Sequence, residues 1–387
     1  MRAATLPVQR PSDARLLVVD EAGGLGERVR TDLPDLLRPG DLVVANDAAT
    51  LPASLGGTHL ASGAPIEVRL AGRASLAPAA TPRFSAVVFG AGDFRTRTED
   101  RPAPPSLGPG DRLALGPLRA EVERTLGHPR LVELRFEGDA DTVNAGIARH
   151  GRPVQYAHVV EPLALWDVWT RIAGPPVAFE PPSAGFVLDW RLLDALRVRG
   201  IGFATLTHAA GLSSTGDPAL DARLPFDEPY RLPSSTVAAI DAARAQGGRV
   251  VAIGTTVARA LEHAAARPGG LRAGEGLADN KLGPASRLGV VDVLVSGTHE
   301  PGTSHHELLR AFVGESTLER VDAALEAGAW RTHEFGDSVW IARERGRPAA
   351  REGAEPVARE RSQPARSNLK TATLASRFGQ LRTTLPA

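Results

Sequence analysis

The sequence predicts an α/β protein: a mixed α/β body interrupted by a small β-barrel-like insertion and followed by a disordered basic tail. Residues 1–56 and 141–343 alternate apolar runs of strand length with amphipathic runs of helix length, which is typical of an α/β body. Residues 57–140 hold short apolar runs separated by Gly and Pro, as in a small barrel. Residues 344–387 are rich in Arg, Pro, Ala and Ser and lack an apolar period.

The individual elements follow from the same patterns. In the first part of the body, residues 14–30 predict a strand, a Gly-rich turn and a second strand, and residues 31–41 predict a short capped helix that ends at Pro39-Gly40. Residues 42–47 predict a buried strand. Five short runs predict the strands of the insertion: 64–70, 84–90, 111–116, 118–126 and 130–138. The second part of the body predicts helices at 190–199, 234–248, 255–266, 307–314 and 318–328, and strands at 201–208, 249–254 and 290–297.

Composition excludes several classes of protein. The 387 residues contain no cysteine, which rules out disulfides, cysteine-ligated metal and thiol nucleophiles. No run is long and apolar enough for a signal peptide or a membrane helix, so we expect a cytoplasmic protein with no membrane partner. The net charge is zero, but the segment from Arg343 to Ala387 has nine Arg and one Lys against four Glu, a net of +6. The tail is therefore either an arm that attracts RNA or a solvated segment without a role.

One predicted strand–turn–helix unit suits an anionic ligand. Gly254 ends a strand, and Thr255 and Thr256 open the following helix, whose first N–H groups and positive dipole end favour a carboxylate or phosphate. No GxGxxG or Walker pattern is present, so nucleotide binding does not follow. Arg259 and Glu262 lie about one turn apart and could pair with each other.

Three of the ten histidines lie within eight positions. His299 follows a strand, at the edge where α/β proteins place ligands. Ser304 and Glu307 fit a capping box, which places His305 and His306 in the first helical turn, roughly 100° apart around the axis. That spacing disfavours joint binding of one metal, so we expect no metal. His299 is the candidate functional residue of the three, and His305 and His306 are expected to be helix-start residues.

The order of seven sequence motifs resembles the S-adenosylmethionine:tRNA ribosyltransferase-isomerase family of queuosine biosynthesis. The resemblance extends from the N-terminus to about residue 343. The motifs are DARLLVVD, DLLRPGDLVVANDAATLPASL, SGAPIEVRL, PPSAGFVLD, DEPYRLPSSTVAAIDAARAQGGRVVAIGTTVARALE, GVVDVLVSGTHEPGTSHHELLRAF and FGDSVWI.

The resemblance implies a reaction as well as the fold. The ribosyl part of S-adenosylmethionine, the co-substrate, is transferred to the aminomethyl group of a 7-deazaguanine base in tRNA, and it isomerises to an epoxycyclopentane while adenine and methionine are released. This chemistry needs a base near C5′, an acid for adenine and a site for the methionine carboxylate. The candidate catalytic residues are His299, His208 and Asp47, and the candidate ligand-binding residues are Asn46, Ser183, Gly185, Thr255, Thr256 and Arg259.

The sequence departs from the family's pattern at several polar positions. Ala48, Ala49, Ser54, Val187, Phe226, Gly297 and Gly302 stand where the family has Thr, Arg, Arg, His, His, Asn and Arg. Three arginines that could contact phosphate are therefore missing, which weakens the prediction of a tRNA partner. Two alternatives stay open: the same scaffold acting on a small-molecule acceptor, or a non-catalytic binding protein.

Overall fold

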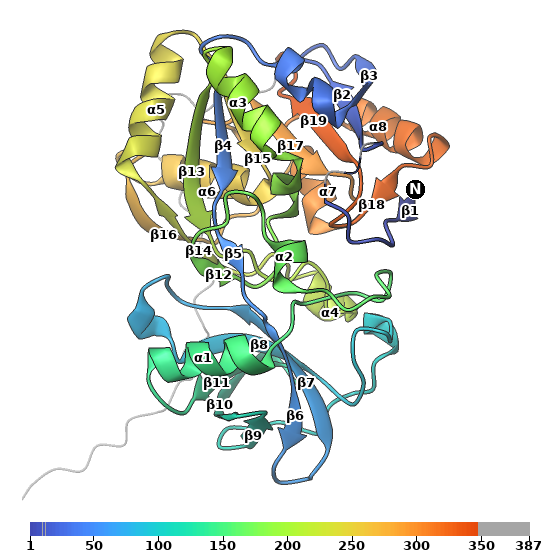
Figure 1. Cartoon of the computed structure of the whole chain (residues 1–387), viewed down its shortest axis with the longest axis vertical. Coiled ribbons are helices and arrows are strands. Elements are labelled where there is room, and N and C mark those ends of the chain that lie inside the picture. The colour runs from blue at the N-terminus through green and yellow to red at the C-terminus, as the bar shows by residue number, and fades with distance from the viewer. Residues whose placement is uncertain (10, 12, 347–387) are drawn as a thin grey trace, which may run out of the picture. The chain divides into compact units, whose positions relative to one another are not determined.

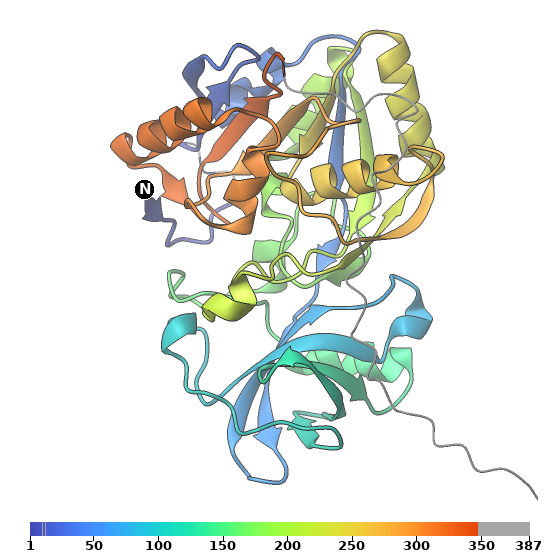
Figure 2. The same cartoon turned by 180° about the vertical axis from the view of Figure 1, so that it is seen from behind.

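The structure, a computed structural model, describes residues 1–9, 11 and 13–346 (Figures 1 and 2). It confirms the predicted class, because a mixed α/β body is interrupted by a closed β-barrel. The predicted tail lies outside the described residues from position 347 onward. No helix of the described chain is both long and apolar enough to cross a membrane.

The body is built on a nine-stranded sheet whose central strands are parallel. In spatial order its strands are β16 (Gly274–Ala278), β14 (Glu228–Leu232), β13 (Gly202–His208), β4 (Leu42–Asn46), β15 (Val250–Ile253), β17 (Val293–Gly297), β19 (Ser338–Ala342), β2 (Arg15–Val19) and β3 (Leu25–Val29). Strands β13, β4, β15 and β17 run parallel to one another, so their carboxyl ends meet at one edge of the sheet. Ligands bind at this edge in open α/β sheets.

Helices cover both faces of this sheet, as β4 shows. Leu42 and Val44 contribute to the core under α5 (Ser234–Ala245), α6 (Thr255–Ala266), α7 (Ser304–Leu309) and α8 (Glu315–Ala327). Val43 and Ala45 contribute to the opposite core, under η1 (Arg30–Leu36), η4 (Ser183–Val187) and α3 (Trp190–Val198). A central parallel strand therefore needs apolar residues at every position, which is why residues 42–45 read as a continuous apolar run.

The insertion forms a closed barrel (blue to green in Figure 1). Its strands follow the order β10 (Leu118–His128), β11 (Leu131–Phe136), β8 (Arg83–Phe89), β7 (Pro65–Gly72), β6 (Ser54–His59) and β9 (Arg112–Leu115). Helix α1 (Ala140–His150) leads back to the body. The barrel core continues into the body, because Phe179, Ala209 and Leu212 belong to the same buried cluster.

The short elements are β1 (Arg2–Ala3) with β18 (Arg331–Thr332), β5 (Ala49–Thr50) with β12 (Pro176–Ala178), α2 (Leu165–Val168), α4 (Pro218–Asp221), η2 (Pro78–Ala80) and η3 (Thr98–Asp100).

Two local predictions differ from the structure. The predicted helix at 31–41 is the 3₁₀ helix η1, which contains Pro34; a proline inside so short a helix has no N–H for a regular α-helical bond. The cap of α7 is Thr303, whose hydroxyl accepts the N–H of His306, so the capping box predicted at Ser304 is wrong by one residue.

Candidate active site

A pocket lies at the carboxyl ends of the parallel strands. Its lining includes Glu180, Ser183, Thr255, Thr256, His299 and His305, and it encloses about 750 Å³ of empty space, part of it open to solvent. We call it the strand-end pocket. Of the predicted residues, Ser183, Thr255, Thr256, Arg259 and His299 line it together. Asn46, Asp47, Gly185 and His208 are not among its lining residues.

The start of α6 presents unpaired backbone donors to this pocket. Gly254, its N-cap, has φ 105° and ψ 149°, a conformation that strongly favours glycine, and no side chain caps the helix. Because the first N–H groups of a helix lack intrahelical partners, a pocket lined by Thr255 and Thr256 at the start of α6 suits an anion.

Arg259 lies one turn along α6 and is 3% exposed. Its Nη1 donates to Glu228, its Nη2 to the carbonyl oxygens of Phe226 (2.8 Å) and Ala278 (2.6 Å), and its Nε to that of Asn280 (2.8 Å). Arg259 thus ties the α6 start to surrounding strands and loops, with each of its nitrogens already bonded to protein.

The predicted pairing of Arg259 with Glu262 is wrong. Glu262 instead accepts the backbone N–H groups of residues 289–291, at 2.6–2.9 Å. The partner of Arg259 is Glu228, which also accepts the Gly211 N–H at 2.5 Å. Burial raises the pKa of Glu228, and the charge of Arg259 opposes that rise.

His299 and His305 stack in the pocket with their ring centroids 4.7 Å apart and their planes 15° apart. The Nε2 of His299 lies 3.1 Å from the hydroxyl of Ser296. Burial lowers the pKa of His299 well below its usual value, and the neighbouring His305 adds to that effect. Burial also lowers the pKa of His305 to about 4. Both rings are therefore uncharged at neutral pH, and His305 lines the pocket as well as starting α7.

His306 points away from this pair. It is buried, and its Nε2 lies 2.9 Å from the carboxylate of Asp322 on α8. This contact joins α7 to α8, in keeping with its predicted role as a helix-start residue.

The other predicted residues support the strand ends from outside the pocket. The Asn46 amide accepts the His208 N–H and donates to the His208 carbonyl, each at 2.9 Å, so it extends the β4–β13 pairing by one residue. Asp47 accepts the hydroxyls of Thr205 (3.0 Å) and Thr207 (2.7 Å). The His208 ring is fully buried, 3.4 Å from Glu228, and burial lowers its pKa to about 3.

Gly185 has a packing role in the structure. A Cβ at this position would lie 2.9 Å from the Thr170 side chain, so glycine permits the close approach of η4 to the segment after α2. Ser183, at the start of η4, faces the pocket.

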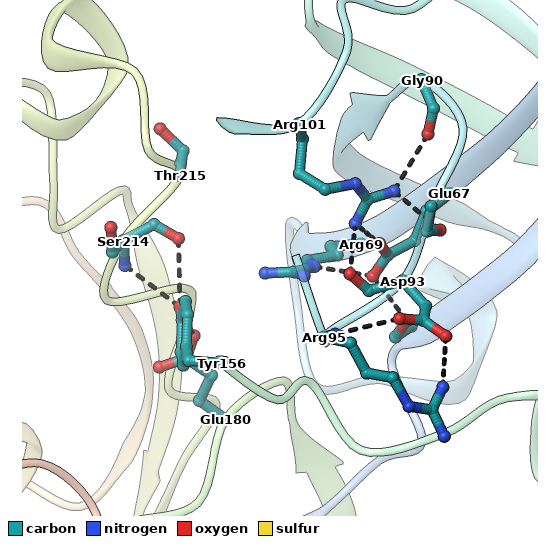
Figure 3. Close-up of polar contacts among 12 residues, drawn as sticks. Glu67, Arg69, Gly90, Asp93, Arg95, Arg101, Tyr156, Glu180, Ser214 and Thr215 are labelled. Atoms are coloured by element: carbon teal, nitrogen blue, oxygen red, sulfur yellow. Dashed lines mark hydrogen bonds and ion pairs between the residues drawn. The ribbon is translucent and has the colours of Figure 1, made fainter. Parts of the chain in front are cut away.

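Sequence reasoning missed Glu180, whose carboxylate accepts the Tyr156 hydroxyl at 2.5 Å (Figure 3). Burial raises the pKa of Glu180 to about 7. The guanidinium carbon of Arg69, on barrel strand β7, lies 5.5 Å from the Tyr156 ring centroid. Figure 3 shows Arg69 on the side of the barrel that faces Tyr156, together with Glu67, which pairs with both Arg69 and Arg101. Nothing in the local sequence marks Glu180, because Tyr156 is 24 positions away.

A second pocket shares Ser213 with the first and encloses about 1050 Å³ of empty space, part of it open to solvent. We call it the His–Glu pocket, after His158, His333, Glu99, Glu300 and Glu334 in its lining. Tyr156 also lines it, so the hydrogen bond between Tyr156 and Glu180 joins the two pockets.

Within residues 1–9, 11 and 13–346, no group of three or more His, Cys, Asp or Glu side chains is arranged to hold a metal ion.

Comparisons with known proteins give one consistent family. A family model described as queuosine biosynthesis protein matches residues 1–341. An S-adenosylmethionine:tRNA ribosyltransferase-isomerase of Azoarcus sp. (strain BH72) is 34% identical over 347 residues, which cover 88% of this chain and 94% of the relative. A protein of the same name from Gloeobacter violaceus is 35% identical over 356 residues, or 87% of this chain and 92% of the relative. The crystal structure of an S-adenosylmethionine tRNA ribosyltransferase from Thermotoga maritima matches with 23% identity and a TM-score of 0.46, covering 88% of this chain and 96% of that one.

Proposed function

This chain belongs to the queuosine biosynthesis protein family, and on that premise we propose that it is an S-adenosylmethionine:tRNA ribosyltransferase-isomerase. It would transfer the ribosyl part of S-adenosylmethionine to the aminomethyl group of a 7-deazaguanine base in tRNA. The observation that supports this best is the strand-end pocket, which combines a helix start for an anion, two uncharged imidazoles and a carboxyl group of raised pKa.

The reaction defines what these groups must do. One N–C bond forms to the amine, while the bond from sugar to adenine and the C5′–S bond break, and each leaving group keeps the bonding pair. The remaining sugar atoms rearrange to the epoxycyclopentane. Adenine takes up one proton, and the amine and C5′ each lose one, so one proton is released overall when the amine starts uncharged.

The pocket offers a group for each requirement. The α6 start at Thr255 and Thr256 would hold the methionine carboxylate, because its N–H groups and dipole favour negative charge. The uncharged imidazoles of His299 and His305 would contact adenine, stacking on its ring and donating an N–H hydrogen bond to it as it leaves. Glu180 would accept the proton from C5′, since a base with a pKa of about 7 is matched to neutral conditions.

The predicted residues other than Ser183, Thr255, Thr256 and His299 then have positioning roles. Asn46 and Asp47 fix the ends of β4 and β13. His208 and Arg259 surround the buried Glu228, whose other oxygen accepts the N–H of Gly211 in the pocket wall. Cytoplasmic tRNA and S-adenosylmethionine would be the partners.

The test is a reaction with S-adenosylmethionine and a tRNA transcript that carries 7-aminomethyl-7-deazaguanine. Adenine is measured by chromatography, and the modified nucleoside by mass spectrometry after digestion of the tRNA. We expect adenine release that depends on the modified tRNA, with one adenine for each nucleoside converted. The same transcript with guanine at that position is the control and should yield no adenine.

Two other outcomes would replace the proposal. Adenine release with the free 7-aminomethyl-7-deazaguanine base but not with tRNA would indicate a small-molecule acceptor. Calorimetric titration comes first, because a folded protein that does not bind S-adenosylmethionine would be a non-catalytic member of the family.

A further inference from the structure

Three stacked aromatic rings contribute to the lining of the His–Glu pocket. The rings of His158 and His333 stack with their centroids 4.2 Å apart and their planes 17° apart, and Tyr156 continues the stack from His158 at 6.2 Å and 8°. His333 has φ 69°, and it shares a positive φ with only one other non-glycine residue of the described chain, Ala329. A positive φ is uncommon for a residue other than glycine. The His333 ring, at the end of the stack, is 37% exposed, so a planar heterocycle can extend the stack there.

The charged groups of this pocket are mainly acidic. Glu99, Glu300 and Glu334 face a single guanidinium, that of Arg97, which pairs with Glu99. The Glu334 carboxylate lies 3.2 Å from the Nε2 of His158, and Glu300 lies 3.9 Å from the Nε2 of His333. Burial lowers the pKa of His333, so its ring adds no positive charge at neutral pH. These carboxylates favour a cationic group and disfavour a carboxylate or phosphate inside the pocket.

The His–Glu pocket adjoins the strand-end pocket. It shares Ser213 with the strand-end pocket, and Tyr156 on its side donates a hydrogen bond to Glu180 on the other. A molecule bound to the stacked rings would therefore lie next to the groups proposed to act on S-adenosylmethionine.

We propose that the His–Glu pocket binds the acceptor, a planar base that carries a protonated primary amine, with the base on the His333 end of the ring stack and the amine beside Glu334 and Glu300. This assignment rests on the proposed function and deepens it, because it separates the acceptor site from the donor site. Arg97 also lines this pocket, and its side chain is 70% exposed, so it could contact the acceptor's backbone.

The test compares two tRNA transcripts that differ only in the substituent at position 7 of one base: the cationic aminomethyl group of 7-aminomethyl-7-deazaguanine or the uncharged nitrile of 7-cyano-7-deazaguanine. Dissociation constants of the whole protein are measured by filter binding without S-adenosylmethionine. We expect the wild type to bind the amine-bearing tRNA roughly tenfold more tightly, the usual contribution of a charge-assisted hydrogen bond.

Two variants test the carboxylates. Glu334→Gln and Glu300→Gln should each reduce this preference to about threefold or less, while the calorimetric dissociation constant for S-adenosylmethionine changes by less than about twofold. Glu300 is 56% exposed, so its replacement cannot disturb packing even if Glu334→Gln lowers stability. Glu275→Gln, which removes an exposed carboxylate on β16 that pairs with Arg231, is the matched control and should behave as the wild type does.

The outcomes separate this inference from the proposed function. If the wild type converts the modified tRNA but both variants keep its preference for the amine, the pocket assignment is wrong and the function stands. If the variants lose affinity for S-adenosylmethionine instead, the pocket is the donor site and the assignment is again wrong. Failure of the wild type to release adenine with any acceptor overturns both.

Discussion

Replacing Arg259 with alanine should destabilise the protein before it affects any ligand. The variant loses the ion pair with Glu228 and leaves three carbonyl oxygens without their donor. The Glu228 carboxylate stays buried, with the Gly211 N–H as its remaining hydrogen bond. Removing one member of a buried ion pair costs about 3–5 kcal/mol, because the other charge is left uncompensated. For a chain of this size that predicts a fall in melting temperature of roughly 4–6 °C.

The loss should depend on pH in a defined direction. Burial already raises the pKa of Glu228 above 4.5, and without Arg259 it rises further. A carboxyl group with a raised pKa in the folded state contributes stability that is fully present below pH 4.5 and is lost as the pH rises through the folded-state pKa. Arg259→Ala should therefore be closer to the wild type at pH 5 than at pH 8.

Thermal melts of four proteins test this reasoning: the wild type, Arg259→Ala, Glu228→Gln and the double variant. Glu228→Gln removes the buried charge that Arg259→Ala leaves without a partner. The double variant should therefore lose at least about 1 kcal/mol less stability than the sum of the two single losses. Arg231→Ala breaks an exposed ion pair with Glu275 and serves as the control, with an expected loss of at most about 0.5 kcal/mol. If Arg259→Ala has the melting temperature of the wild type but fails to bind S-adenosylmethionine, the guanidinium contacts the ligand and the structural explanation is refuted.

Three further predictions concern the strand-end pocket. Glu180→Gln should lower kcat/KM about 100-fold. The wild type should become more active as the pH rises through about 7, where Glu180 becomes ionised, and the variant should lack this rise. A pH profile that the substitution leaves unchanged would exclude Glu180 as the base. His299→Gln should lower turnover roughly 100-fold at an unchanged melting temperature. His306→Gln breaks the contact with Asp322, so it should cost about 1–3 kcal/mol of stability and leave turnover unchanged. The reverse pattern would contradict the roles assigned to the two histidines. Gly254→Ala should weaken binding of S-adenosylmethionine in calorimetry, since a side chain at φ 105° costs about 1–3 kcal/mol and displaces the α6 start; wild-type affinity would remove that helix start from the binding site.

The fold was predictable where local sequence determines the element. The strand, turn and helix around Gly254 follow from a short apolar run, one glycine and a long amphipathic run, and the structure contains all three. β16 was not predicted, because its sequence GEGLA has neither apolar alternation nor β-branched residues. It exists because it pairs with β14 at the sheet edge, and such a partner is not visible in local sequence.

The sequence predicted where in the fold the candidate site lies better than it predicted the contacts of the side chains there. Residues that follow parallel strands were expected at one edge, and His299 and Thr255 do meet there. Hydrogen-bond partners depend on long-range register instead. Arg259 pairs with a residue 31 positions away rather than with its helical neighbour, and the amide of Asn46 is occupied by backbone 162 positions away.

The departures from the family pattern do not remove the proposed chemistry, because of where they lie. Ala48 and Val187 are buried in two hydrophobic cores, and Phe226 packs against one of them. The hydroxyl of Ser54 donates to Glu67 inside the barrel. Of the substituted positions, Gly297 lines the strand-end pocket. The groups assigned to proton transfer are therefore still present together.

The charges of the two pockets explain why donor and acceptor would need separate sites. S-adenosylmethionine carries a sulfonium cation, and the acceptor amine is also cationic until it loses a proton, so the two repel each other as they approach. In these proposals the α6 start would bind the negative end of the donor, and Glu300 and Glu334 would bind the positive end of the acceptor. Glu180 lies between them, hydrogen-bonded to Tyr156, and its raised pKa means that it can take up a proton near neutral pH. The same carboxyl group can thus reduce the repulsion while it is ionised and accept the proton whose loss the reaction requires.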